Sequence, residues 1–199
     1  MKKKIFILCM IFLLLIFAFC GYKFFRTGNN KNIESIGELG EYILNISNYE
    51  IEANVTIYSN KNSNTYRFTE YKMNEYQKQE IFNEEDNNSI VIENDGDKLT
   101  IKNTLLDLTQ VFENYEEVTK NTIGFDAFLD DYNNSDSVNI SEDEKYYLIF
   151  VKVKNSSNKY IQNKTLFMDK KSGKAEKIEV KDINNNSTIV IEYTRFQIL

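Results

Sequence analysis

The side chains that most often carry enzyme chemistry are missing from most of this chain. None of the 199 residues is His, and the two Cys are Cys9 and Cys20. Without His, the chain lacks the commonest general base, the commonest metal ligand and every Ser-His or Cys-His nucleophile. Because no Cys follows Cys20, the rest of the chain also lacks a thiolate nucleophile, a Cys-zinc site and a disulfide. We therefore expect no catalytic residue, no metal site and no cofactor.

Three acidic clusters are the remaining candidates for chemistry. Residues 94–97 (NDGD) lack the spaced oxygen ligands and the final Glu of a calcium loop, and they separate two alternating segments, so we interpret them as a hairpin turn. Residues 84–86 and 141–144 lie in polar stretches and are interpreted as solvated charge runs. A carboxylate pair for glycoside cleavage needs only a suitable separation in space, but the chain has no Trp to hold a sugar.

The N-terminus has the pattern of an export signal. Residues 2–4 are all Lys, and residues 5–19 form an uninterrupted apolar run. A positive start followed by such a run is typical of a secretory signal, and the charge keeps that end in the cytoplasm. The run is also close to the lower length limit for a membrane-spanning helix. We expect residues 1–25 to be a signal sequence or membrane anchor, residues 26–32 a tether, and the body to be exported.

Cys20 leaves three alternatives open. Ala18 and Gly21 fit a lipoprotein signal, in which a diacylglyceryl group is attached to Cys20 and the chain is cut before it, whereas Phe19 is larger than such signals prefer. The lipid-attachment site is the favoured interpretation. The alternatives are an uncleaved anchor and simple secretion.

The charges exclude some partners. Residues after Arg26 hold 19 Lys and Arg against all 30 Asp and Glu, a net charge of −11. Such a domain does not bind nucleic acid by neutralising phosphates, and an anionic membrane surface would repel it. The acidity suits solubility or a basic partner.

Hydrophobic spacing predicts a mainly β (α+β) domain over residues 33–199. Apolar residues recur every three or four positions over 33–46, which predicts a helix, and then every second position from Ile51 to Ile57, which predicts a strand. The phase slips by one within residues 65–73, which suggests a bulge. Residues 105–115 are expected to be a short helix or irregular, and Thr122 to cap a second helix. Residues 145–154 are apolar on both faces and predict a central strand covered on both sides. Further strands are predicted over 76–82, 89–93, 98–104, 159–169, 175–182 and 187–196.

Together these elements predict eight to ten strands in sequential hairpins, with one helix before them and one in the middle. We expect a curled antiparallel sheet, or half-open barrel, with helices on its concave face. Aromatic residues fall mostly within the strands. They are interpreted chiefly as core, with a subset that could line an apolar cavity or face a partner. That subset is Tyr66, Phe68, Tyr71, Phe125, Phe128 and Leu129.

The order of elements resembles the lipoprotein-carrier (LolA-like) fold. The segments that carry the resemblance lie at residues 49–59, 90–102 (IVIENDGDKLTIK), 112–115 (FENY), 124–132, 166–178 and 189–196. With its Lys-rich, lipoprotein-like start, the chain is most similar to the clostridial germination lipoprotein family GerS. The resemblance implies a non-catalytic protein of the developing spore envelope, on the extracytoplasmic face of the membrane, that binds and activates the cortex amidase CwlD. It would also allow a homo-oligomer. The alternative is a carrier or sensor that holds an acyl chain or a lipoprotein in a half-barrel cavity.

Overall fold

The structure is a computed structural model that describes residues 36–113, 123–154 and 156–199. The chain divides into two compact units, residues 1–32 and 33–199, and the described residues all belong to the second. Neither helix among these residues has the length and apolar character needed to cross a bilayer. The expected signal or anchor, the tether, Cys20 and the Thr122 cap lie outside the described residues.

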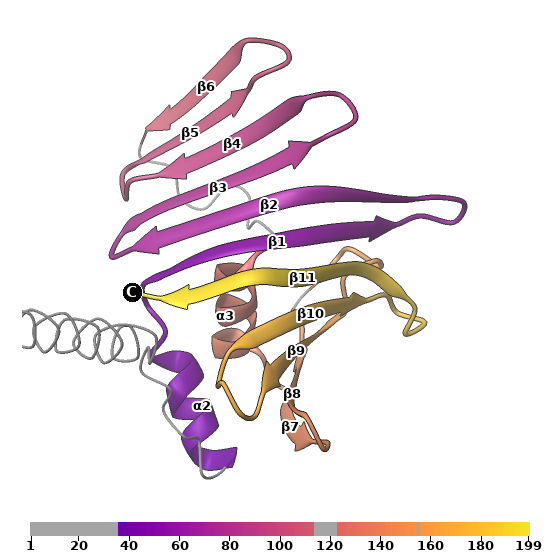
Figure 1. The fold of residues 1–199 in the computed structure, drawn as a ribbon. Coiled ribbons are helices and arrows are strands. Elements are labelled where there is room, and N and C mark those ends of the chain that lie inside the picture. Colours follow the sequence, from indigo (N-terminus) through magenta and orange to yellow (C-terminus); the bar gives the residue numbers. More distant parts are fainter. Residues whose placement is uncertain (1–35, 114–122, 155) are drawn as a thin grey trace, which may run out of the picture. The chain divides into compact units, whose positions relative to one another are not determined.

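The described residues form two helices and one large sheet (Figure 1). The helices are α2 (Ile36–Leu44) and α3 (Phe125–Asn134). The first six strands are β1 (Tyr49–Tyr58), β2 (Ser63–Met73), β3 (Tyr76–Asn83), β4 (Asn88–Asn94), β5 (Lys98–Asn103) and β6 (Leu108–Glu113). After α3 follow β7 (Val138–Glu142), β8 (Tyr146–Lys152), β9 (Asn163–Asp169), β10 (Ala175–Lys181) and β11 (Ser187–Ile198).

The predicted fold class is confirmed. All eleven strands belong to one open antiparallel sheet in the order β6-β5-β4-β3-β2-β1-β11-β10-β9-β8-β7. The first and last strands therefore pair at its centre, and every other neighbour pair is consecutive along the chain. This arrangement follows from short turns between alternating segments, since two antiparallel strands can be joined by a tight hairpin. The hairpin predicted at residues 94–97 joins β4 to β5, where Asn94 pairs with Leu99.

The core lies on the face of the sheet that carries α3, which we call the inner face. Along β1 the residues Tyr49, Ile51, Ala53 and Val55 are at most 2% exposed, because alternate side chains of a strand point to the same face. They pack with Phe125 and with the inner residues of β8 to β11 in a single buried cluster. In Figure 1, α3 lies behind β11 and β10, so the viewer faces the outer surface of the sheet.

The predicted bulge within residues 65–73 is wrong. Strand β2 pairs without interruption with β1 and with β3. The inner face of β2 instead carries Phe68 and then Glu70, which is only 1% exposed. A reading that assigned apolar residues to the inside had to slip by one residue at this buried carboxylate. The bulge in the sheet lies in β11, where Glu52 pairs with Arg195 but Ala53 pairs with Tyr193.

Two other predicted segments need correction. Residues 105–115 were expected to be helical or irregular, but residues 108–113 form β6, the edge strand beside β5. The spacing of Leu105, Leu108 and Phe112 imitates a helix because β6 is exposed along its whole length and no alternation marks a buried face. Strand β8 is buried on its inner face and half-buried on its outer face, so it is not covered on both sides.

Candidate functional site

A buried carboxylate on the inner face is the most unusual chemical group among the described residues. Glu70 lies on β2, where sheet register places it beside Ile51 of β1 and Gln79 of β3. Its Oε1 accepts hydrogen bonds from the Tyr49 hydroxyl at 3.1 Å and from the amide groups of Gln77 and Gln79 at 3.0 Å each. The strands on both sides of β2 thus direct polar side chains to one oxygen atom within the apolar core.

The second oxygen of Glu70 binds the start of α3. The backbone N–H of Phe125 donates to Oε2 at 2.7 Å, and that of Asp126 approaches Oε1 at 3.4 Å. The first N–H groups of a helix have no partner within it, and a negative charge there also interacts favourably with the helix dipole. The residue at the N-cap position is Gly124, which has no side chain to do this. Glu70 therefore caps α3 from another element of the fold.

Gly124 makes this contact sterically possible. Its φ is +121°, a conformation that favours glycine. A Cβ atom at this position would lie 2.9 Å from the Glu70 Oε2 and 3.1 Å from the Gln79 amide nitrogen. The glycine thus serves two purposes, since it permits the backbone turn and leaves room for the carboxylate.

A buried amine holds the next part of α3. Lys164 of β9 is 2% exposed, and its Nζ lies 2.6 Å from the Asp131 carboxylate and 3.1 Å from the carbonyl oxygen of Ala127. Lys72 of β2 forms a further ion pair with Asp126. The helix is therefore fixed by charged groups from strands on both sides of the β1–β11 pair.

The electrostatics of these groups follow from burial. Burial raises the pKa of the Glu70 carboxyl, and the hydrogen bonds from Phe125 and Gln79 oppose that shift. Burial lowers the pKa of the Lys164 ammonium, and the Asp131 carboxylate opposes it. The acceptor sites of Glu70 are occupied by five donors, so the carboxylate is arranged to hold a helix and not to take a proton from a substrate. Within the described ranges, no three His, Cys, Asp or Glu side chains are placed to share a metal ion.

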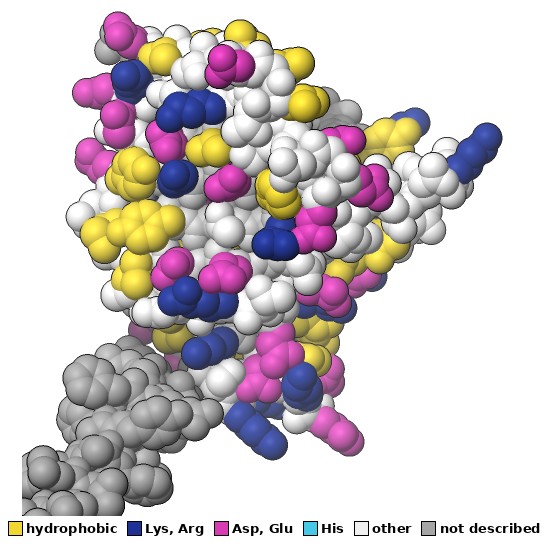
Figure 2. Space-filling view, turned by 45° about the horizontal axis from the view of Figure 1, so that its top comes forward, with side chains coloured by type: hydrophobic (Ala, Val, Ile, Leu, Met, Phe, Trp, Pro, Cys, Tyr) yellow, Lys and Arg dark blue, Asp and Glu magenta, His cyan; other side chains and the backbone are white. Residues whose placement is uncertain are grey.

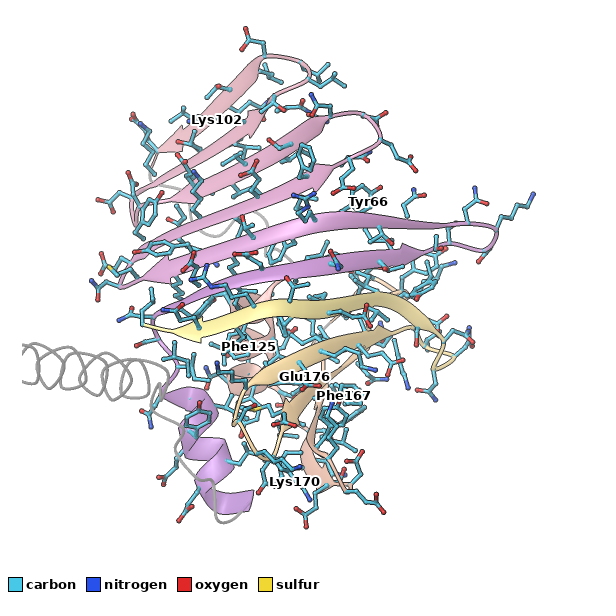
Figure 3. The ribbon with its side chains drawn as sticks, in the orientation of Figure 1. Tyr66, Lys102, Phe125, Phe167, Lys170 and Glu176 are labelled. Atoms are coloured by element: carbon cyan, nitrogen blue, oxygen red, sulfur yellow. The ribbon has the colours of Figure 1, made fainter. Side chains whose placement is uncertain are left out.

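The six aromatic and apolar residues singled out from the sequence separate into two groups. Four are almost fully buried, at 0 to 9% exposure: Phe68, Phe125, Phe128 and Leu129. Phe125 lies within a ring cluster, with centroids 5.4 Å from Tyr49 and 4.9 Å from Phe196. Tyr66 is half-buried on the inner face further along β2, well away from Phe125 in Figure 3. Tyr71 is half-buried on the outer face, with its ring 6.1 Å from that of Tyr76.

Sequence reasoning brought the four buried residues together but missed the polar groups that hold α3. Glu70, Gln79 and Lys164 look like ordinary surface residues of alternating strands. One signal pointed to them, because the apolar alternation of β2 fails at Glu70. A role for any of the six residues in lining a ligand cavity or facing a partner stays a prediction.

The sequence comparisons assign the chain to a family. A family model described as "Sporulation protein YdcC-like" matches residues 2–199. The chain belongs to the YdcC-like family of sporulation proteins. A search of curated proteins finds no match.

Solved structures share the fold of this YdcC-like protein at low sequence identity. One is from the structure of the CwlD amidase from Clostridioides difficile in complex with the GerS lipoprotein, with 20% identity, a TM-score of 0.50, and coverage of 84% of this chain and 98% of that chain. Another is an uncharacterised conserved protein from Thermus thermophilus, with 6% identity, a TM-score of 0.54, and coverage of 83% and 88%. A LolA superfamily protein from Nitrosomonas europaea matches at 12% identity and a TM-score of 0.40, with coverage of 82% and 93%. The resemblance to GerS stated from the sequence is confirmed at the level of the fold.

Proposed function

We propose that this YdcC-like protein is a non-catalytic, membrane-anchored envelope protein required for spore germination, and that it binds and activates a spore cortex N-acetylmuramoyl-L-alanine amidase. The observation that carries the proposal is the shared fold with the protein solved in complex with the CwlD amidase, over nearly all of that chain. Membership of a sporulation family supports the same setting.

The chemistry of the chain supports a binding role. The sequence has no His, and its last Cys is Cys20. The buried carboxylate Glu70, which could have been a candidate acid or base, holds the N-terminus of α3 with both oxygen atoms. Any contribution to cell-wall chemistry would then be made through another protein.

The N-terminal segment supports placement of this role at the outer face of the membrane. Residues 2–4 and the apolar run that follows them have the features of an export signal, and Cys20 would receive the lipid. The body would be released from the membrane if neither lipid nor anchor held it. Labelled fatty acid should therefore enter the wild-type protein and be absent from Cys20→Ser. Wild-type protein without label would favour the uncleaved anchor.

One observation favours the carrier as a second candidate function. Register extends the inner face from buried Phe68 through Ile81 and Ile90 to Leu108 at the sheet edge. Ile90 is 37% exposed and Leu108 is 47% exposed, so the inner face of the β4 to β6 region offers apolar surface to an acyl chain.

A pull-down from sporulating cells separates the two functions. Tagged full-length protein, solubilised in mild detergent, should retain a cortex amidase identified by mass spectrometry. Lipid extraction of the same sample tests the carrier. A stoichiometric acyl lipid without an amidase would contradict the proposed function, and an untagged strain gives the background.

A further inference from the structure

Exposed apolar side chains gather at the end of the sheet where β1 ends and β11 begins. Tyr58, Tyr160 and Ile183 are 46%, 51% and 67% exposed. Both the β1–β2 and the β10–β11 hairpins project to this end, on the right of Figure 1. Together with Lys159 they form what we call the sheet-end patch: Tyr58, Lys159, Tyr160 and Ile183.

Backbone contacts place these residues beside one another. The N–H of Ile183 donates to the carbonyl oxygen of Lys159 at 3.1 Å. The hydroxyl of Thr188 donates to the carbonyl oxygen of Tyr160 at 2.7 Å. Because Ile57 pairs with Ile189, Tyr58 follows next to Thr188 on the neighbouring strand. Three segments that are far apart in the sequence therefore contribute to one surface.

Hydrogen bonds within the two loops fix the patch before any partner arrives. The Asp182 carboxylate accepts from the backbone N–H groups of Asn184 and Asn186 at 2.8 Å each, which holds the turn that displays Ile183. The Asn158 side chain accepts from the N–H of Tyr160 at 3.0 Å. An apolar surface that is already ordered loses less entropy when it binds.

The surroundings of the patch are basic, although the body of the protein is acidic. Residues 145–181 hold ten Lys against three Asp and Glu. The Lys159 Nζ lies 4.9 Å from the centre of the Tyr160 ring, and Lys152, at the end of β8, is exposed. The Asp182 charge is directed at its own turn. By contrast, positive and negative side chains are interspersed over the face shown in Figure 2.

We propose that the sheet-end patch is where this protein docks its amidase partner, and that the partner presents an apolar pocket with an acidic rim. This inference rests on the proposed function. Tyr is enriched at the energetic centres of protein interfaces, and complementary charge raises the association rate. A glycan would stack on Tyr58 and Tyr160 but gain little from an aliphatic group such as Ile183, so a protein is the better fit.

The test uses full-length protein in detergent and the purified cortex amidase, with affinity measured by surface-immobilised binding. The variant Tyr160→Ala/Ile183→Asn should weaken binding at least ~10-fold, the loss expected for a residue at the energetic centre of an interface. Its matched control is Leu105→Ala/Leu106→Asn in the β5–β6 turn, where the two residues are 63% and 67% exposed. The control should bind within about twofold of wild type, as a residue outside the interface does. Both pairs are exposed, and unchanged unfolding midpoints would show that neither variant disturbs the fold.

A charge reversal adds a second, independent readout. Lys159→Glu should lower the association rate several-fold at low salt and reduce its salt dependence, whereas Lys98→Glu at the opposite end of the sheet should not. Wild-type affinity of the Tyr160/Ile183 variant would overturn the docking site and leave the proposed function standing. An amidase that does not bind wild-type protein would refute both. Patch-dependent sedimentation with cortex peptidoglycan alone would reassign the surface to a glycan.

Discussion

At the residue scale, the structure depends on a carboxylate in an apolar core. Removing Glu70 would leave the Phe125 N–H and the side chains of Tyr49 and Gln79 as buried donors without this acceptor. Each buried, unsatisfied donor costs about 1–3 kcal/mol. We expect Glu70→Ala to lower the free energy of unfolding by about 3 kcal/mol or more, measured by urea denaturation. A loss below about 1 kcal/mol would mean that water replaces the carboxylate.

The charge state of Glu70 gives a pH-dependent prediction. Because its pKa in the folded state is raised above the ordinary value of 4.5, the folded protein binds this proton more tightly than the unfolded chain. Its contribution to stability is complete below the ordinary pKa and is lost as the pH rises through the folded-state pKa. The difference in unfolding free energy between wild type and Glu70→Gln, which cannot titrate, should fall over that window. A difference that grows with pH would show that the hydrogen bonds outweigh burial.

Gly124 offers a test with an internal control. Gly124→Ala places a methyl group against Glu70 at a positive φ and should destabilise the protein by about 1–3 kcal/mol. Gly40 lies within α2, where a Cβ would meet only the Tyr132 hydroxyl, at 3.1 Å. Alanine is the better helix former by about 1 kcal/mol, so Gly40→Ala should be neutral or stabilising. Equal losses in thermal unfolding would contradict the proposed capping geometry.

At the scale of elements, α3 is held by two buried charges on different parts of the sheet. The Lys164–Asp131 pair is 3% and 17% exposed at its side chains, so little solvent screens it. Lys164→Met would leave Asp131 without its cation and should cost about 3 kcal/mol. A double-mutant cycle with Asp131→Asn should give a coupling energy of about 1–3 kcal/mol. Additive losses would show that the two groups stabilise α3 independently.

Most elements could be predicted from the sequence because alternation and helical spacing follow burial. Alternating Ile51 to Ile57 identified β1, and Phe125 with Phe128 identified α3. The errors occurred where that link fails. Glu70 is polar but buried, while Leu108 and Phe112 are apolar but exposed on an edge strand. The pairing of β1 with β11 also depends on contacts between the two ends of the domain, which no local pattern encodes.

At the scale of the whole molecule, the net charge of the sequence conceals its distribution. The body was expected to suit a basic partner because it carries −11 after Arg26. Ten Lys between residues 145 and 181 make one part of the sheet basic, so an acidic partner is accommodated there. The sequence contained this asymmetry, but only the fold shows which of these Lys lie at a shared surface and which, such as Lys164, are buried.

The anchoring predicted for the N-terminus can be tested on intact cells. Protease added to protoplasts should digest the body, because residues 2–4 keep the start of the chain in the cytoplasm and direct the remainder outward. A cytoplasmic protein serves as the control for membrane integrity. Full protection of the body in intact protoplasts would contradict export.

The most direct test of the central claim is amidase activity in a reconstituted mixture. Full-length protein is titrated into the purified cortex amidase with peptidoglycan as substrate, and released products are quantified. The protein alone should release nothing, because it has no His and no Cys after Cys20. With amidase present, activity should rise and saturate near equal amounts of the two proteins. Product release by the protein alone, or amidase activity that stays flat over the whole titration, would contradict the account.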